Sequence, residues 1–288
     1  MATKTTYQCE VLVNERLTDT VYRLALAAPE LARAAKPGQF AAVRCGGPDA
    51  YLRRPLGICD ADAAAGSVTL LSQVKGKGTR ALTEYVYGHM LDVLGPLGNG
   101  FDLSGFERES AGGRAAAVVG GGIGLFPLLL LTKRLRALGF APDVFLGFRD
   151  RQSAVLLEEF KRAAGRLFCA SDDGSLGEAG LVTAPFARAQ KVGGGESGVV
   201  RYRDVFACGP APMLRAVQRI CGEAGTDAQL SLEQRMGCGV GACLVCACAI
   251  RDPALARAGQ AGPDDFWYKR VCRDGPVFPA KAVVFDEQ

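Results

Sequence analysis

Four cysteines near the C-terminal end constrain this chain more than any other feature. Cys238, Cys243 and Cys246 follow the pattern Cys-x4-Cys-x2-Cys, and Cys272 comes after 25 further residues (247–271). This spacing is typical of four thiolates that hold one 2Fe-2S cluster. Glycines at 237, 239 and 241 alternate with other residues in the same stretch, and glycine can adopt the positive φ angles that turn backbone amides toward cluster sulfurs. We therefore predict these four cysteines as iron ligands.

Two other interpretations of these cysteines are open. Free cysteine often behaves as a small buried hydrophobe, and cysteine quartets also bind zinc. Zinc sites tend to pair two short Cys-x2-Cys knuckles, which the x4 gap and the single distant cysteine fit poorly. A fifth cysteine, Cys248, lies two residues beyond Cys246. If Cys246 faces the cluster, we expect Cys248 to face away from it, into the core of a small C-terminal lobe.

Length and composition predict a globular protein of several domains. The 288 residues suggest about two domains with room for a small third. The longest apolar run, residues 125–131, is too short for a membrane span of about 20 residues, so we expect no membrane partner. The net charge of +4 is spread along the chain, which gives no sign of a nucleic-acid partner. Eleven cysteines, with no signal-peptide pattern, predict a cytoplasmic protein that uses cysteine for metal or redox chemistry.

Histidine is almost absent from the sequence. The single histidine, His89, follows a glycine and is expected at a turn or strand edge. A Ser-His or Cys-His catalytic pair needs a positioned histidine next to a nucleophile. The composition therefore disfavours hydrolysis by general-base catalysis.

The first third of the chain, residues 1–108, is predicted to form a small antiparallel β-barrel. Short segments rich in β-branched and aromatic residues alternate with Gly, Pro and Asp turns. The expected strands are residues 7–13, 20–26, 39–45, 68–74 and 90–94. The glycine- and proline-rich segment 94–101 is expected to be a loop.

Two motifs in this region are suited to binding a phosphate. The first is Arg53-Arg54-Pro55-Leu56-Gly57-Ile58, in which Arg54 can pair with a pyrophosphate. The second is Gly76-Lys77-Gly78-Thr79, which precedes an expected helix over residues 80–87, where backbone amides can receive an anion. A solvated strand edge and an ordinary turn are the alternatives for the two motifs.

Residues 113–228 are predicted to form a doubly wound, parallel α/β domain that binds a dinucleotide. Residues 115–119 read as a strand buried on both faces. The run Gly120-Gly121-Gly122-Ile123-Gly124 follows, and then a leucine-rich helix with Pro127 near its start. Glycines at such a strand–helix turn allow backbone amides to approach a pyrophosphate. A tight turn without a ligand is the alternative.

Further strands of this domain are expected at residues 143–147, 166–170 and 204–207. Asp172 follows the third strand of the domain, where a carboxylate can accept hydrogen bonds from ribose hydroxyls and would repel a 2′-phosphate. This position favours NAD over NADP, while Arg149 and Arg151 argue for NADP. Cys208 and Gly209 form the turn after the last of these strands, and a buried structural thiol is the alternative for Cys208.

Residues 229–288 are predicted to form the small 2Fe-2S lobe. A strand is expected at residues 247–250 and a polar insertion loop at 251–268. Two aromatic residues, Phe266 and Trp267, close this loop. They are expected either to be exposed for a contact or to fold over the cluster, and both interpretations are open.

These motifs together resemble the ferredoxin–NADP reductase superfamily. Its flavin barrel carries an Arg-Pro-Leu/Ile/Tyr-Ser element and a later Gly-x-Gly-Thr element, and its nucleotide domain carries Gly-Gly-Gly-Ile-Gly-x-x-Pro. Serine is usual in the superfamily where this chain has Gly57. The resemblance implies that Cys208 and Gly209 face a nicotinamide ring, without a catalytic acid or base. It implies contacts with FAD for Arg54, Pro55, Leu56, Gly57, Leu71, Ser72, Gln73, Gly78 and Thr79, and with NAD for Gly120, Gly121, Gly122, Gly124 and Asp172.

Over nearly its whole length the chain resembles the electron-transfer subunits of type B dihydroorotate dehydrogenase. The most specific segments are 233–246, with Glu-x-Arg-Met-x-Cys-Gly-x-Gly-x-Cys-x2-Cys, and 271–278, with Val-Cys-x-Asp-Gly-Pro-Val-Phe. The resemblance implies an FMN-containing catalytic subunit as partner, which oxidises dihydroorotate to orotate, and a heterotetramer of the two subunit types. Electrons would pass from the partner's FMN through the cluster and FAD to NAD.

Two alternatives to this function are open. Related FAD/2Fe-2S subunits serve NADPH–ferredoxin oxidoreductases and sulfhydrogenases. From another class, a redox sensor or scaffold could use the cluster to regulate binding, and it would lack NADH-to-dye activity.

Overall fold

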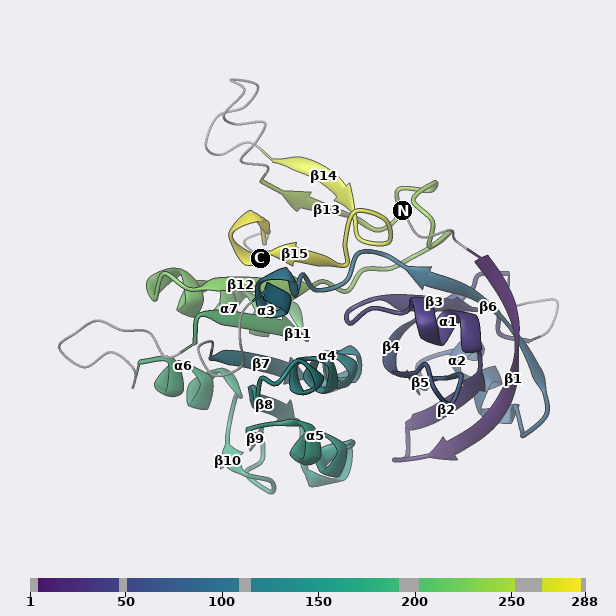
Figure 1. Cartoon of the computed structure of the whole chain (residues 1–288), viewed down its shortest axis with the longest axis horizontal. Coiled ribbons are helices and arrows are strands. Elements are labelled where there is room, and N and C mark those ends of the chain that lie inside the picture. The colour runs from purple at the N-terminus through teal and green to yellow at the C-terminus, as the bar shows by residue number, and fades with distance from the viewer. Residues whose placement is uncertain (1–4, 47–50, 109–114, 192–201, 252–265, 286–288) are drawn as a thin grey trace.

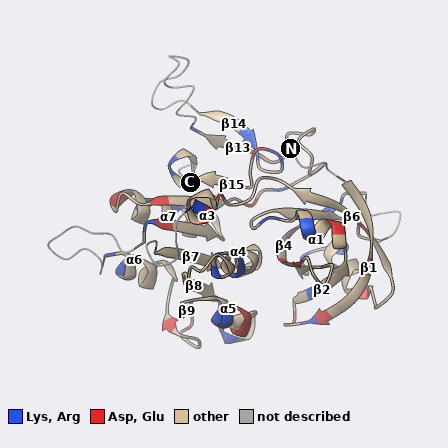
Figure 2. Ribbon diagram, viewed as in Figure 1, with Lys and Arg blue, Asp and Glu red and all other residues tan. Residues whose placement is uncertain are grey.

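The computed structural model describes residues 5–46, 51–108, 115–191, 202–251 and 266–285, and it shows a barrel, a layered α/β unit and a small lobe (Figure 1). The glycine-rich segment 192–197 and most of the predicted insertion loop lie outside the described residues. None of the described helices is long and apolar enough to cross a membrane. Basic and acidic residues are scattered over the ribbon (Figure 2).

The first part is a closed antiparallel barrel, as predicted. Its strands are ordered β1-β2-β5-β4-β3-β6. One strand was missed, because Pro55 and Gly57 interrupt the strand pattern of β4. A short helix, α1 (Pro29–Ala34), was also missed. The bounds are β1 (Thr5–Arg16), β2 (Val21–Ala27), β3 (Phe40–Val43), β4 (Arg54–Asp62), β5 (Ser67–Gln73) and β6 (Met90–Leu97).

The predicted loop at 94–101 is wrong in its first half, because β6 continues through Leu97. The β3–β6 register shifts between the pairs Phe40–Leu97 and Ala42–Leu94, so the ladder accommodates Gly95 and Pro96 within the strand. Leu97 is fully buried, and its burial explains why the chain stays in the sheet despite two poor strand formers.

The helix predicted at 80–87 is also different in the structure. It consists of α2 (Lys77–Ala81) and the 3-10 turn η1 (Leu82–Glu84). The Thr79 hydroxyl accepts hydrogen bonds from the backbone amides of Lys75 (2.9 Å) and Gly76 (3.2 Å). These bonds start the helix three residues earlier than predicted, so Gly78 and Thr79 lie inside it.

The second part is a seven-stranded sheet of order β10-β9-β8-β7-β11-β12-β15, parallel except for β15 (Figure 1). All four strands predicted for this domain are present, within two residues at each end. The strands are β7 (Ala116–Gly121), β8 (Asp143–Phe148), β9 (Arg166–Ser171), β10 (Glu178–Ala179), β11 (Asp204–Cys208), β12 (Asp227–Ser231) and β15 (Val277–Pro279). The helices are α3 (Ser104–Arg108), α4 (Phe126–Ala137), α5 (Leu157–Ala163), α6 (Thr183–Lys191) and α7 (Ala211–Glu223), with 3-10 turns η2 (Gly122–Leu125) and η3 (Arg151–Ser153).

The third part is a small antiparallel pair, β13 (Ala247–Ile250) and β14 (Trp267–Arg270). Trp267 and Tyr268, expected at the end of the insertion loop, therefore belong to a strand. The predicted domain boundary at 228/229 falls inside β12, and β12 and β15 both join the central sheet. The last described element is η4 (Ala280–Ala282).

One hydrophobic core joins all three parts. It contains Phe40, Ala42 and Leu97 from the barrel, side chains of the central sheet, and Cys246, Val271, Cys272 and Phe278 from the C-terminal segment. A separate core fills the barrel, and another lies between the central sheet and α4, with Val21, Cys59 and Leu71 of the barrel at its edge. The cysteines are therefore packed against the barrel rather than held on an independent arm.

A polar network stabilises the starts of β8 and β9. Asp143 is buried, and its carboxylate accepts hydrogen bonds from Arg166 Nε (2.9 Å) and from the Tyr202 hydroxyl. Burial, followed by the neighbouring Asp143 carboxylate, raises the pKa of Tyr202, so its hydroxyl stays protonated and remains a donor.

Replacing Tyr202 with Phe should lower the free energy of unfolding by about 1–2 kcal/mol, since a hydrogen bond to a charged group is lost. Urea denaturation followed by far-ultraviolet circular dichroism measures this change. Tyr268→Phe, at a residue that is 74% exposed, is the matched control and should leave the midpoint unchanged. Equal midpoints for the two variants would contradict the role given to the network.

Candidate cofactor pocket and cysteine centre

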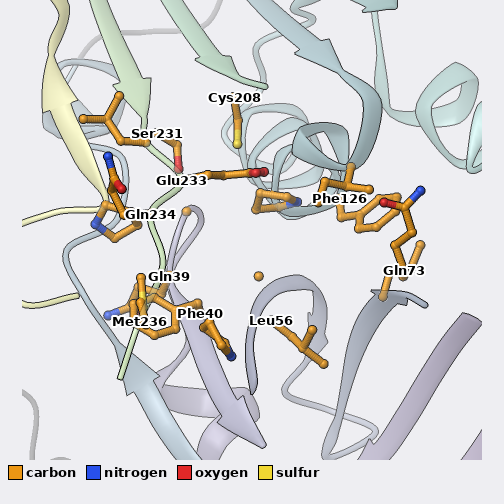
Figure 3. A pocket seen from close by; sticks show the side chains of 18 of the residues that line it. Gln39, Phe40, Leu56, Gln73, Phe126, Cys208, Ser231, Glu233, Gln234 and Met236 are labelled. Atoms are coloured by element: carbon orange, nitrogen blue, oxygen red, sulfur yellow. The ribbon is translucent and has the colours of Figure 1, made fainter. Parts of the chain in front are cut away.

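A cavity of about 270 Å³ lies where the barrel, the central sheet and the C-terminal segment meet (Figure 3). Cys208, Ser231 and Glu233 lie on one side of it, and Phe40, Leu56 and Met236 lie opposite. Apolar walls with a few polar side chains are typical of cofactor pockets. The lining residues are Gly38, Gln39, Phe40, Pro55, Leu56, Gly57, Leu71, Gln73, Lys75, Thr79, Ile123, Phe126, Pro127, Cys208, Ser231, Leu232, Glu233, Gln234, Met236 and Pro276.

The two phosphate-binding motifs predicted in the barrel lie side by side. A Cβ atom built on Gly78 would lie 2.6 Å from Arg54 Cζ, so only glycine allows the guanidinium to rest there. Thr79 lines the pocket next to this contact. Arg53, in contrast, pairs with Asp92 (2.8 Å) and donates to backbone carbonyls of the barrel. The Arg54 guanidinium donates to the Leu52 carbonyl and forms no ion pair with a described residue, and it lies beside Gly78 without itself lining the pocket. Of the two arginines, Arg54 is the one placed to reach an anion at this end of the pocket.

The pocket also explains why this chain has glycine at position 57. A Cβ atom there would approach Pro127, at the start of α4, to 3.2 Å. Both residues line the pocket. The missing side chain lets α4 pack closely on β4, and a serine would require one of the two elements to shift.

Strand β5 presents alternate residues to the pocket. Leu71 and Gln73 line it, whereas Ser72 between them is buried at 3% exposure and is not among the lining residues. The Ser72 hydroxyl finds no hydrogen-bond partner among the described residues. Successive side chains of a strand point to opposite faces, so Ser72 points away from the face that Leu71 and Gln73 present to the pocket. The motif alone predicted all three residues as flavin contacts.

The glycine-rich run is divided between a strand and a turn. Gly120 and Gly121 belong to β7, and Gly122 adopts φ +55° at the turn itself. A Cβ atom on Gly124 would lie 2.5 Å from the Gly209 backbone. This close approach brings the turn after β7 against the turn after β11, beside Cys208.

Asp172 lies at the exposed end of β9, and the neighbouring loops are tied together. Asp173 accepts hydrogen bonds from Ser175, and Arg151 donates through Nε to the Ser175 carbonyl (3.0 Å). The ends of β8 and β9 thus meet at one edge, with carboxylates and an arginine close together. Arg151 and Asp173 are engaged within these loops, while Asp172 is exposed.

Cys208 is buried and stays a neutral thiol. Burial, and then the nearby Glu233 carboxylate, raises the pKa of Cys208 to about 12. The Glu233 side chain is exposed at the pocket, and desolvation by the surrounding protein raises its pKa. A buried neutral thiol is poorly suited to act as a thiolate nucleophile.

Glu233 and Ser231 were not predicted as site residues. The strand order would have indicated both residues, because Cys208 pairs with Ser231 where the parallel strands β11 and β12 end. The residues that follow neighbouring parallel strands share one edge of a sheet. Sequence alone did not establish that these two strands are neighbours.

The four predicted cysteine ligands lie in two pairs. The Cys238 sulfur accepts hydrogen bonds from the amides of Val240 (3.4 Å), Ala242 (3.2 Å) and Cys243 (3.4 Å), and the Cys243 sulfur accepts one from the amide of Cys238 (3.3 Å). In the second pair, the amide of Cys272 donates to the Cys246 sulfur (3.4 Å). Gly239 and Gly241 have the predicted positive φ, whereas Gly237 does not, and Leu244, which was not predicted, has φ +61°.

This arrangement fits a two-iron cluster. Within the described parts of the chain, no three His, Cys, Asp or Glu side chains converge tightly enough for a single metal ion. Two sulfur pairs match two irons with two thiolates each. Burial opposes ionisation of Cys238, but the donating amides outweigh it and lower its pKa to about 6, which prepares a thiolate for iron.

The two pairs differ in exposure. Cys246 and Cys272 are buried in the shared core, while Cys243 is exposed beside Leu244 and Val245, which are 62% and 56% exposed. Cys248 packs against the shared core that also contains Cys246 and Cys272, and burial raises its pKa to about 11. That its side chain faces away from the ligands stays a prediction. Phe266 is exposed and touches the Tyr268 ring.

Comparison with known proteins identifies the family. The iron-sulfur cluster binding domain of dihydroorotate dehydrogenase B matches residues 233–284, which contain all four cysteines. A dihydroorotate dehydrogenase B (NAD(+)) electron transfer subunit from Caldanaerobacter subterraneus subsp. tengcongensis is 36% identical over 278 residues, 96% of this chain and 98% of that protein. The corresponding subunit from Bacillus caldolyticus is 40% identical over 269 residues, 93% and 94% of the two chains. This chain belongs to the dihydroorotate dehydrogenase B electron transfer subunit family.

Solved structures of other proteins share the fold of this chain. The NADH-dependent reduced ferredoxin-NADP oxidoreductase matches 99% of this chain and 91% of its own, with a TM-score of 0.77 and 26% identity. A ferredoxin NADP+ reductase from Neisseria gonorrhoeae, with bound FAD and NADP, matches 76% of this chain and 92% of its own, with a TM-score of 0.61 and 13% identity. The second likeness concerns the fold alone.

Replacing Arg54 with Ala should weaken FAD retention by about 10- to 100-fold, because a charge-assisted hydrogen bond contributes roughly 1.5–3 kcal/mol. Flavin retained after dialysis, compared with iron content, measures the effect. Arg53→Ala removes the neighbouring arginine, which pairs with Asp92, and should lower barrel stability without this loss of flavin. Stoichiometric FAD in dialysed Arg54→Ala protein would show that the pyrophosphate assignment is wrong.

Proposed function

We propose that this chain carries electrons from a partner dihydroorotate dehydrogenase subunit to NAD through a 2Fe-2S cluster and FAD. The observation that carries the proposal is the continuity of the two sites. Met236 lines the pocket, and Cys238, two residues later, begins the cysteine set. A pocket that accepts a flat ring therefore adjoins four thiolates arranged for a cluster.

The barrel side of the pocket supplies the proposed FAD site. Leu56, Leu71 and Phe126 offer apolar surface for a flavin ring, and Arg54 with Gly78 and Thr79 offers an anion site for its pyrophosphate. The unpaired, buried Ser72 hydroxyl marks a polar group near this region. Flavin supplies the exchange between one-electron and two-electron chemistry.

The balance of electrons explains why three redox groups are needed. A bound cluster would supply electrons one at a time, and a bound flavin would exchange them in pairs, so that two electrons and one proton would pass to NAD+ together as one hydride. No side chain has to act as acid or base in the hydride step, and the neutral Cys208 thiol serves as part of the nicotinamide wall.

The sheet side of the pocket supplies the proposed NAD site. Gly120, Gly121, Gly122 and Gly124 allow the backbone to approach a dinucleotide, and Gly209 packs against the same turn. The exposed Asp172 carboxylate is suited to ribose hydroxyls and would repel a 2′-phosphate. We therefore favour NAD over NADP.

The exposed side of the cysteine centre is proposed to face an FMN-containing catalytic subunit. Cys243, Leu244 and Val245 form an accessible edge of the centre. Apolar residues exposed around a redox group are suited to docking another protein. We propose that the two subunit types form a heterotetramer. We also propose a cytoplasmic location, because all eleven cysteines are free thiols.

A second candidate function has one specific observation in its favour. The NADH-dependent reduced ferredoxin-NADP oxidoreductase structure covers nearly the whole chain. Its 26% identity is well below the 36–40% shared with the dihydroorotate dehydrogenase B subunits, which also match over their full length. The dihydroorotate-linked function is therefore preferred.

The decisive experiment isolates the chain with its natural partner from source cells and adds dihydroorotate. The complex should reduce NAD+, and should reduce NADP+ at least about tenfold more slowly if Asp172 repels the 2′-phosphate. The absorbance of NADH measures both reactions. A complex that leaves dihydroorotate unoxidised but reduces ferredoxin would favour the second candidate.

A variant separates the two cofactor sites in the same assay. Cys243→Ser should abolish dihydroorotate-dependent NAD reduction, because the cluster loses a ligand, while NADH-to-dye transfer through FAD continues. Loss of both activities, with FAD also lost, would contradict the separation of the sites.

A further inference from the structure

The pocket and the fourth cysteine are connected by a continuous chain of hydrogen bonds. It begins at Gln39, which lines the pocket and is 7% exposed. The Gln39 side chain accepts a bond from the Lys36 amide (2.8 Å) and donates one to the Gly98 carbonyl (2.8 Å). The wall of the pocket is thereby fixed to the segment that leaves β6.

Asn99 then connects this segment to the turn that carries Cys272. Its backbone amide donates to the Gly275 carbonyl (2.6 Å), and its side-chain Nδ2 donates to the carbonyls of Asp274 (3.0 Å) and Arg273 (3.2 Å). Arg273 directly follows Cys272. Three consecutive carbonyls of the cysteine turn are thus held by one residue of the barrel segment.

Close packing next to Asn99 restricts the distance between the barrel segment and the cysteine turn. Gly98 has φ +75°, and a Cβ atom there would lie 2.5 Å from Pro276 Cδ and 2.8 Å from the Gly275 carbonyl oxygen. A side chain at position 98 would therefore push the cysteine turn away from the barrel.

The same turn is fixed to the loop that carries the other cysteines. Asp274 accepts hydrogen bonds from the Arg270 amide (2.8 Å) and Nε (3.0 Å), and Arg270 Nη1 donates to the Gly241 carbonyl (3.2 Å). On its other side, this loop packs through Gly239 against Leu97 of β6. A displacement of the turn would consequently move the whole ligand set relative to the pocket.

We propose that Asn99 is a positioning residue that sets the separation of the cluster from FAD, and with it the rate of electron transfer between them. The inference rests on the proposed function, which supplies both groups. Each transfer moves one electron, so that one group is oxidised and the other reduced by the same amount. Because electron tunnelling weakens steeply with distance, a small displacement of the turn changes the rate without removing either group.

The test follows NADH oxidation by the complete chain in an anaerobic stopped-flow experiment. Reduction of FAD by NADH gives a first optical phase, and reduction of the cluster gives a second. Asn99→Ala should leave the first phase and the FAD and iron contents unchanged and slow the second phase, because the rate of electron transfer falls as the two groups move apart. The exposed position of Asn99 means that the substitution opens no buried cavity.

A spectroscopic readout distinguishes positioning from general loss of stability. In half-reduced protein, the magnetic coupling between flavin and cluster should weaken in Asn99→Ala, because it depends on their separation. Gln218→Ala is the matched control. Gln218 Nε2 also donates to two backbone carbonyls, those of Ala280 and Val283, which lie outside the hydrogen-bond chain from Gln39 through Asn99 to the cysteine turn. It should change neither the second phase nor the coupling. Gly98→Ala should reproduce the Asn99→Ala effect by wedging the turn outward.

Three results would overturn the proposal. Unchanged cluster reduction and coupling in both Asn99→Ala and Gly98→Ala would show that the bridge does not set the separation. Loss of iron from Asn99→Ala would assign the residue to retention of the cluster. An equal slowing in Gln218→Ala would show a general effect of lost hydrogen bonds. Wild-type protein without flavin or iron would instead refute the proposed function itself.

Discussion

The packing of the cysteine loop against the barrel is the interaction on which the rest of the structure depends. Gly239 lies against Leu97 and Ala42, and the buried pair Cys246 and Cys272 shares one core with the same barrel residues. β12 and β15 carry the chain from the central sheet to the cysteine turn and back. The C-terminal segment is thus anchored in two other parts of the molecule, and this anchoring gives the proposed cluster a fixed place beside the pocket.

The same arrangement places a different part of the chain on each side of the pocket. The anion site at Arg54 and Gly78 belongs to the barrel, the glycine turns belong to the sheet, and the C-terminal segment contributes Glu233 and Met236 between them. In the proposed function, hydride exchange with a dinucleotide and electron exchange with a cluster would take place on different sides of one flavin. The exposed Cys243 edge lies on the far side of the centre from the buried pair, which suits the arrival of electrons from outside.

Much of this organisation was predictable from the sequence, because the motifs carry strong local signals. The closed barrel, the parallel sheet after Ala115 and the cysteine-bearing lobe follow from turn residues, buried strands and ligand spacing. What the sequence could not show were effects that arise only from tertiary contacts. Burial of Leu97 keeps Gly95 and Pro96 in a strand, the strand order places Glu233 beside Cys208, and Pro127 explains Gly57. The role of Asn99 likewise required knowledge of which turn it meets.

The most direct test of the account is the iron, acid-labile sulfide and flavin content of anaerobically purified protein, together with its visible spectrum. The account predicts about two irons, two sulfides and one FAD per chain, with overlapping flavin and iron–sulfur absorbance. A colourless protein with one zinc, or protein free of both iron and sulfide, would contradict it.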